Sequence, residues 1–73
     1  MGLTSHRYEI GCSYCGVIEY ENTLTNALET AKNAQKRHSG ANESITVYNL
    51  MARRGMPDKW SIDGTVLGYR ENY

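Results

Sequence analysis

The hydrophobic pattern predicts one amphipathic helix over residues 23–40, around which the rest of the chain packs. Small or apolar residues recur there at steps of three and four, which places them on one helical face. They are Leu24, Ala27, Leu28, Ala31, Ala34 or Gln35, and His38. Thr23 is expected to cap the first turn, and Gly40 to close the last one in a left-handed conformation. Because Leu28 lies in the middle of this face, we expect it to be the most buried residue of the helix.

Two-residue alternation of apolar and polar residues predicts strands on both sides of the helix. The expected strands are residues 7–14, 17–21, 45–51, 59–62 and, as a returning edge strand, 65–69. The first two form a hairpin around the turn CSYC. Asp63-Gly64 is a strong signal for a two-residue hairpin turn before the last strand. Pro57 cannot donate a hydrogen bond to a sheet, so residues 52–58 are expected to form a loop.

These elements predict an α+β fold, β-β-α-β-β(-β), with a single antiparallel sheet of four or five strands and one helix packed across one face. One domain spans residues 1–73, with residues 1–6 and 70–73 expected to be frayed. The expected core is Tyr8, Ile10, Val17, Ile18, Tyr20, Leu24, Leu28, Ile45, Val47 and Trp60.

The length of 73 residues limits the stability that such a core can provide. The chain has six tyrosines and no phenylalanine, so the core is small. We expect modest stability unless a partner, a metal or a second copy in a homodimer adds to it. No apolar run is long enough to cross a membrane and no signal-peptide pattern follows Met1, so we expect a cytoplasmic protein with reduced cysteines.

The charged residues are unevenly distributed along a chain of zero net charge. Residues 1–31 carry four acids and one base, residues 32–62 two acids and six bases, and the remainder two acids and one base. A neutral total argues against a dedicated nucleic-acid-binding domain. The basic residues still suggest a contact surface for an acidic protein or a nucleic acid; an ordinary solvated helix face is the alternative. The residues of this expected partner-binding surface are Lys32, Lys36, Arg37, Arg53 and Arg54, with Tyr48 as an aromatic neighbour.

Cys12 and Cys15 form a Cys-x2-Cys motif in the hairpin turn, which resembles half of a zinc knuckle. A structural zinc ion takes four ligands, and the only other soft ligands are His6 and His38. Four ligands are not assembled convincingly from these residues, so we expect no cofactor and no stoichiometric metal. Zinc bound by Cys12 and Cys15, within one chain or across a dimer, is the alternative. A redox role is disfavoured because redox cysteine pairs lie at a helix amino terminus.

No pattern of catalytic residues is present. The chain has no phosphate-binding loop, metalloprotease motif or Ser/His/Asp arrangement, and Glu19 and Glu21 are typical of a solvated strand face. His38 is interpreted as a residue that interacts with the helix dipole at the carboxyl end. We therefore expect that the protein is not an enzyme.

The order of elements resembles that of small phage-encoded inhibitors. The segments that carry the resemblance are IEYE, LTNALETAKNAQ, ITVYN and DKWSIDG, within residues 8–64. They are similar to a compact type I-F anti-CRISPR protein in the order hairpin, helix, strand, tryptophan strand. The small phage inhibitor of bacterial RNA polymerase has a similar strand–helix–strand core. The Cys-x2-Cys hairpin and the Asp63-Gly64 turn are not part of that pattern. The resemblance implies a non-enzymatic phage or mobile-element protein in the host cytoplasm.

The sequence thus predicts an interaction protein that binds and inhibits a host protein or nucleoprotein complex. The alternative is a nucleic-acid-binding or zinc-knuckle accessory module, which would use either Cys12 and Cys15 or the basic helix face.

Overall fold

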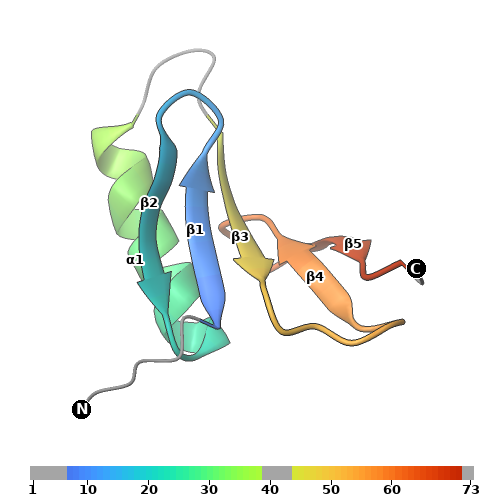
Figure 1. Cartoon of the computed structure of the whole chain (residues 1–73). Helices are drawn as coiled ribbons and strands as arrows, with labels where there is room; N and C mark the ends of the chain where they lie inside the picture. The colour runs from blue at the N-terminus through green and yellow to red at the C-terminus, as the bar shows by residue number, and fades with distance from the viewer. Residues whose placement is uncertain (1–6, 39–43, 72–73) are drawn as a thin grey trace.

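The computed structural model describes residues 7–38 and 44–71, which form one open antiparallel sheet of five strands and one helix (Figure 1). The elements are β1 (Tyr8–Cys12), β2 (Gly16–Glu21), α1 (Leu24–Arg37), β3 (Ile45–Asn49), β4 (Pro57–Trp60) and β5 (Val66–Tyr69). The strand order is β2-β1-β3-β4-β5. The predicted α+β fold, with its fifth strand, is therefore confirmed.

Helix α1 begins and ends through local hydrogen bonds. The Asn26 amide donates to the Thr23 hydroxyl at 3.2 Å, which confirms Thr23 as the N-cap. At the other end the His38 amide still donates to the Ala34 carbonyl at 2.9 Å, but His38 has a non-helical φ of −119° and ψ of 65°, so the helix ends at Arg37. The predicted cap at Gly40 lies outside the described residues. Within the described chain, no helix is long and apolar enough to cross a membrane.

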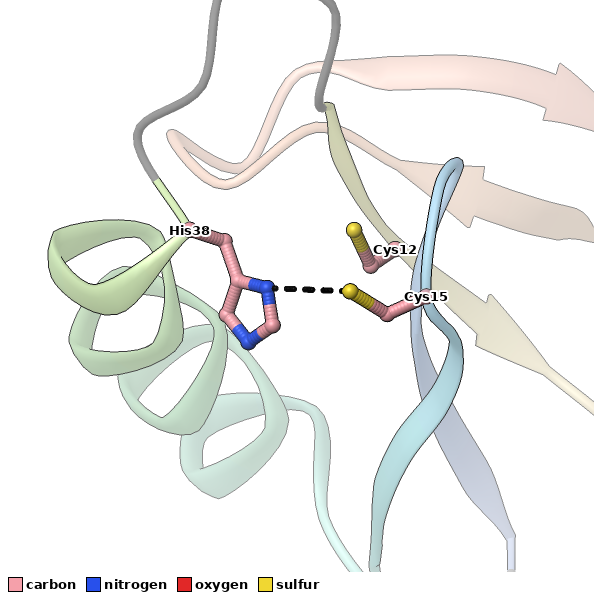
Figure 2. Close-up of side chains that lie close together, drawn as sticks. All are labelled: Cys12, Cys15 and His38. Atoms are coloured by element: carbon pink, nitrogen blue, oxygen red, sulfur yellow. Dashed lines mark hydrogen bonds between the residues drawn. The ribbon is translucent and has the colours of Figure 1, made fainter.

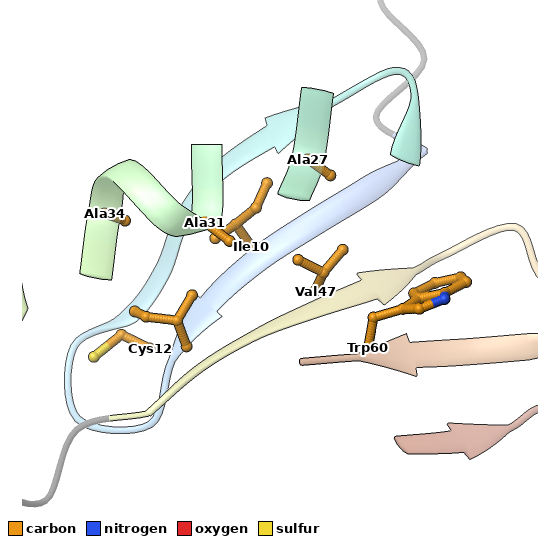
Figure 3. Packing of buried hydrophobic residues seen from close by; sticks show 8 residues of the cluster. Ile10, Cys12, Ala27, Ala31, Ala34, Val47 and Trp60 are labelled. Atoms are coloured by element: carbon orange, nitrogen blue, oxygen red, sulfur yellow. The ribbon is translucent and has the colours of Figure 1, made fainter. Parts of the chain in front are cut away.

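Three alanines bring α1 close to the sheet. Ala27, Ala31 and Ala34 are completely buried against the strand residues Ile10 and Val47 (Figure 3). Small side chains at all three positions let the helix backbone approach the strands, because no bulky group holds it away.

The prediction that Leu28 is the most buried helix residue is wrong. Leu28 is half-buried and packs against the edge of the core. Its side chain lies on the flank of α1 near Gly64 in the β4–β5 turn, whereas the alanines face the sheet directly.

A β-bulge changes which side chains of β2 face the helix. Glu19 pairs with Ile10 but Val17 pairs with Gly11, so Ile18 is an extra residue in β2. An extra residue reverses the alternation of side chains along a strand. Ile18 therefore packs against the core while Tyr20 is exposed. The prediction that Val17 and Tyr20 belong to the core is wrong, since both are exposed; the other predicted core residues are buried or half-buried.

Strands β4 and β5 extend beyond the helix. α1 packs against β1, β2 and β3 but not against β4 or β5. Trp60 is the one buried residue of this part of the sheet, and its ring meets Tyr8 edge-on with centroids 6.0 Å apart. The prediction that Pro57 lies in a loop is wrong. Pro57 is the first residue of β4, where the ladder tolerates a proline without an N–H group.

The β4–β5 turn is tight but longer than predicted. The Ser61 amide donates to the Thr65 carbonyl at 2.9 Å, and the Gly64 amide donates to the Ser61 carbonyl at 3.0 Å. The loop therefore has three residues, 62–64, instead of the predicted pair Asp63-Gly64. Gly64 takes a φ of 91°, which is the left-handed conformation that such three-residue hairpin loops require at this position.

We expect Ala31→Leu to destabilise the protein by about 1–3 kcal/mol, because a larger side chain would push α1 away from the sheet. Urea unfolding measures the change. Asn33→Leu is the matched control, since Asn33 is exposed on the same helix, and surface changes usually alter stability by only about 0.5 kcal/mol. Equal stabilities of the two variants would show that the alanine face is wrongly assigned.

We also expect Asp63 to titrate well below an ordinary aspartate. The hydroxyl of Ser61 and the amide of Thr65 donate hydrogen bonds to its carboxylate and lower its pKa to about 2. Because the pKa of Asp63 is lower in the folded than in the unfolded protein, its carboxylate stabilises the folded protein at pH values above the unfolded-state pKa. This stabilisation is lost as the pH falls toward 2. NMR titration of Asp63 checks the value, and Ser61→Ala should raise it. An unchanged pKa in that variant would contradict the assignment.

Candidate functional site

Cys12, Cys15 and His38 come together where the β1–β2 turn meets the end of α1 (Figure 2). Cys12 is the last residue of β1, Cys15 lies in the turn, and His38 caps the helix. Their ligand atoms all lie within 4.8 Å of one another, and Cys15 Sγ is 3.5 Å from His38 Nδ1. Cys12 is buried, His38 is half-buried and Cys15 is exposed. Two sulfur atoms and one imidazole nitrogen therefore converge at the surface.

Hydrogen bonds at the turn and at the helix end support the three side chains. The turn is tied to the start of β3, because the Ser13 amide donates to the Ser44 carbonyl at 3.0 Å and the Ser44 amide donates to the Ser13 hydroxyl at 3.1 Å. The Gln35 side chain donates to the His38 carbonyl at 3.0 Å. Gly16 closes the turn with a φ of 90°.

From the sequence alone, His38 is interpreted as a residue at the carboxyl end of the helix and is not grouped with the cysteines. The signal that connects them is positional: His38 follows Ala34 by four residues and so continues the face that packs on the sheet. Since β2 joins α1 through only Asn22 and Thr23, the helix runs back along β2. Its carboxyl end therefore returns to the turn where β2 began. The sequence predicts Cys12 and Cys15 alone as the metal alternative, and the structure adds His38 to them.

The expected partner-binding residues do not form one surface. Lys32, Lys36 and Arg37 are exposed on α1, and the last two lie in the turn of helix nearest to Cys15. Arg53 and Arg54 follow β3, at the opposite end of the sheet from this helix end (Figure 1). The four steps from Ile45 to Asn49 separate the two ends by about 13 Å.

Arginines do gather at the loop between β3 and β4. We define the arginine cluster as Arg7, Arg53, Arg54 and Arg70, all of which are exposed. The Gly55 amide donates to the Arg70 carbonyl at 3.1 Å, and the Leu50 amide donates to the Arg7 carbonyl at 2.8 Å. Arg7 and Arg53 also line a pocket of about 270 Å³ with Met51 and Met56. The sequence interpretation missed Arg7 and Arg70, because strand pairing brings them to the loop.

Apolar side chains are exposed around the same loop. We call residues 50–70 the arm, which comprises the β3–β4 loop, β4, the β4–β5 turn, β5 and Arg70. Six of the nine large hydrophobic residues that are exposed in the described chain belong to the arm. They are Leu50, Met51, Met56, Val66, Leu67 and Tyr69. The arm thus combines apolar and cationic groups outside the part of the sheet that α1 covers.

Tyr48 lies on the sheet face that α1 leaves open. It pairs with Glu9 and packs across Gly11, where a Cβ atom would lie 3.5 Å from the tyrosine ring. A pocket of about 390 Å³ on this face is lined by Tyr48, Glu9 and Asp58, among others. Tyr48 is half-buried there, so part of its side chain is accessible. Trp60, in contrast, faces the core.

No protein-family model, curated protein or solved structure matches the chain. The resemblance to anti-CRISPR proteins therefore stays a prediction, as does the assignment of any partner.

We expect the two thiols to differ in reactivity in the reduced, metal-free protein. Cys15 is exposed and should be alkylated quickly, whereas Cys12 is only 5% exposed and should react slowly. Mass spectrometry of timed alkylation measures both rates, with the urea-unfolded chain as the control in which the rates converge. Faster labelling of Cys12 in the folded protein would contradict the described packing of β1.

Proposed function

We propose that this protein is a non-enzymatic interaction protein that binds a larger protein or nucleoprotein complex through the arm and blocks it. The observation that carries the proposal is the concentration of exposed apolar residues and arginines on a part of the sheet without helical cover. Monomeric proteins rarely leave large contiguous apolar surfaces exposed, and such surfaces commonly mark contact sites.

The side chains of the arm suit a protein partner. Tyrosine, methionine and arginine are enriched at protein interfaces, where a few such residues provide most of the binding energy. Tyr69 is 59% exposed on β5, and Met51 and Met56 flank the arginine cluster. These residues would contact apolar side chains of the partner.

The charges of the arm favour an acidic partner surface. Residues 50–70 carry four bases and two acids, and Arg7 adds a further base at the same loop. One of the acids, Asp63, lies in the β4–β5 turn. A basic surface accelerates association with an acidic partner and rejects a basic one.

The blocking role, the phage or mobile-element origin and a host-cytoplasmic location follow the resemblance stated above and belong to this proposal. Lys32, Lys36 and Arg37 form a second basic surface on α1. The proposal assigns the partner to the arm, because the helix surface lacks neighbouring exposed apolar groups; the exposed large hydrophobics of the described chain lie on strands, turns and the arm.

Two matched charge reversals test this assignment. Arg53→Glu with Arg54→Glu alters the arm, and Lys32→Glu with Lys36→Glu alters the helix. Both double variants change the net charge by the same amount, and all four residues are exposed. Partners captured from a bacterial lysate with the parent protein are purified, and their affinities for all three proteins are measured. We expect the arginine reversal to weaken binding at least tenfold, chiefly by slowing association, and the lysine reversal to change it by less than about twofold.

A larger loss of affinity from the lysine reversal than from the arginine reversal would place the interface on α1. An affinity that neither reversal changes would exclude both basic surfaces as the interface. Circular dichroism and urea unfolding verify that each variant is folded. Binding to bare DNA or RNA that falls steeply with salt would instead favour the nucleic-acid-binding alternative.

A further inference from the structure

The separations among Cys12, Cys15 and His38 match those around a tetrahedral metal ion. Zinc–sulfur bonds of about 2.3 Å and zinc–nitrogen bonds of about 2.0 Å place neighbouring ligand atoms about 3.5–3.8 Å apart. Cys15 Sγ and His38 Nδ1 are already 3.5 Å apart, and no separation within the group exceeds 4.8 Å. Shifts of about 1 Å or less would therefore complete the geometry.

The surroundings of the sulfur atoms also fit metal thiolates. The Tyr14 amide donates to Cys12 Sγ at 3.4 Å, which stabilises negative charge on that sulfur. Hydrogen bonds to ligand atoms orient them and adjust their affinity for a metal. The bonds between Ser13 and Ser44 tie the turn to the start of β3, and the bond from Gln35 to the His38 carbonyl orders the helix end.

The helix terminus favours a cation over a free thiolate. The carboxyl end of α1 carries partial negative charge, which attracts a cation and disfavours a bare thiolate. Reactive cysteine pairs instead lie at the amino terminus of a helix, where partial positive charge stabilises the thiolate. Two thiolates and one imidazole are ligands that select Zn²⁺ over Mg²⁺ or Ca²⁺, and together with Zn²⁺ they form a neutral group.

We propose that Cys12, Cys15 and His38 bind one Zn²⁺ ion, which ties the end of α1 to the β1–β2 turn. The described residues supply three ligands, so the fourth tetrahedral position is open to water. Binding releases the thiol protons, so affinity falls as the pH falls. The expectation of a metal-free chain rested on four ligands not being assembled from His6, Cys12, Cys15 and His38, and the structure brings three of these residues together.

A metal crosslink would also compensate for a weak core. Ile10 and Val47 are the only large side chains that are completely buried in the described chain. Domains of this size commonly gain stability from a bound metal or from disulfides. The proposal is independent of the proposed function, because the site lies at the opposite end of β3 from the arginine cluster.

Cobalt binding by the untagged full chain tests the site, because Co²⁺ reports thiolate and tetrahedral coordination in its absorption spectrum. Metal-free protein is titrated with Co²⁺ and then Zn²⁺ under reducing, oxygen-free conditions. The variants are Cys15→Ser and His38→Gln, which avoid the buried Cys12, and His6→Gln is the matched control. Metal content of the purified parent is measured separately by mass spectrometry.

We expect one Co²⁺ per chain with thiolate-to-cobalt charge transfer, and displacement by Zn²⁺. Loss of a residue that only hydrogen-bonds to a metal ligand already lowers metal affinity about 10–100-fold. Cys15→Ser and His38→Gln should therefore each lower the affinity for Co²⁺ at least tenfold, and His6→Gln should leave it unchanged. Free Zn²⁺ at about 100 times its Kd should raise Tm by about 10 °C or more. It should also protect Cys15 from alkylation.

The proposal is overturned by the absence of a one-to-one complex, or by affinity that His38→Gln leaves unchanged. A stoichiometry of one metal per two chains would equally overturn it and would indicate a site shared by the cysteines of two copies. Circular dichroism of the metal-free variants separates a lost ligand from a lost fold.

Discussion

The close contact of α1 with β1 and β3 through three alanines is the constraint on which the rest of the structure depends. Ala27, Ala31 and Ala34 are completely buried and let the helix backbone lie close to the sheet, but they bury little volume. Packing therefore fixes the position of the helix although the core is small. Because close-packed interiors tolerate little change in volume, this contact fixes the position of every group that the helix carries. The half-buried Leu28 and Leu24 pack at its margins.

The short connection between β2 and α1 determines where the helix ends. Two residues between the elements force the helix to run back along the strand that precedes it. Fourteen helical residues rise about 21 Å and six strand residues extend about 20 Å. The two lengths match, so the helix ends beside the turn where β2 begins. His38 meets Cys12 and Cys15 for this reason, although it lies 23 positions after Cys15 in the sequence.

The sequence predicted those features of the fold that depend on residues close to one another in the chain. The Thr23 cap, the alanine face and the strand alternation of β1 and β3 depend on nearby residues, and they are confirmed. The exposure of Tyr20 depends on a bulge at Ile18 that no residue pattern marks, because it arises from pairing with β1. The arginine cluster was missed for a similar reason. Arg7 and Arg70 are distant in sequence from Arg53, and hydrogen bonds across the sheet bring them together.

The helix covers three strands of a five-strand sheet, and this asymmetry separates the two candidate sites. The Cys12–Ile45 pair lies at one end of β3 and the Tyr8–Asn49 pair at the other, about 13 Å away. Sites more than about 10 Å apart without shared partners usually contribute independently to free energy. A metal at the helix end would thus affect binding by the arm mainly through the fraction of folded protein. Strand β3 belongs to both ends, so the arm depends on the stability of the same small core.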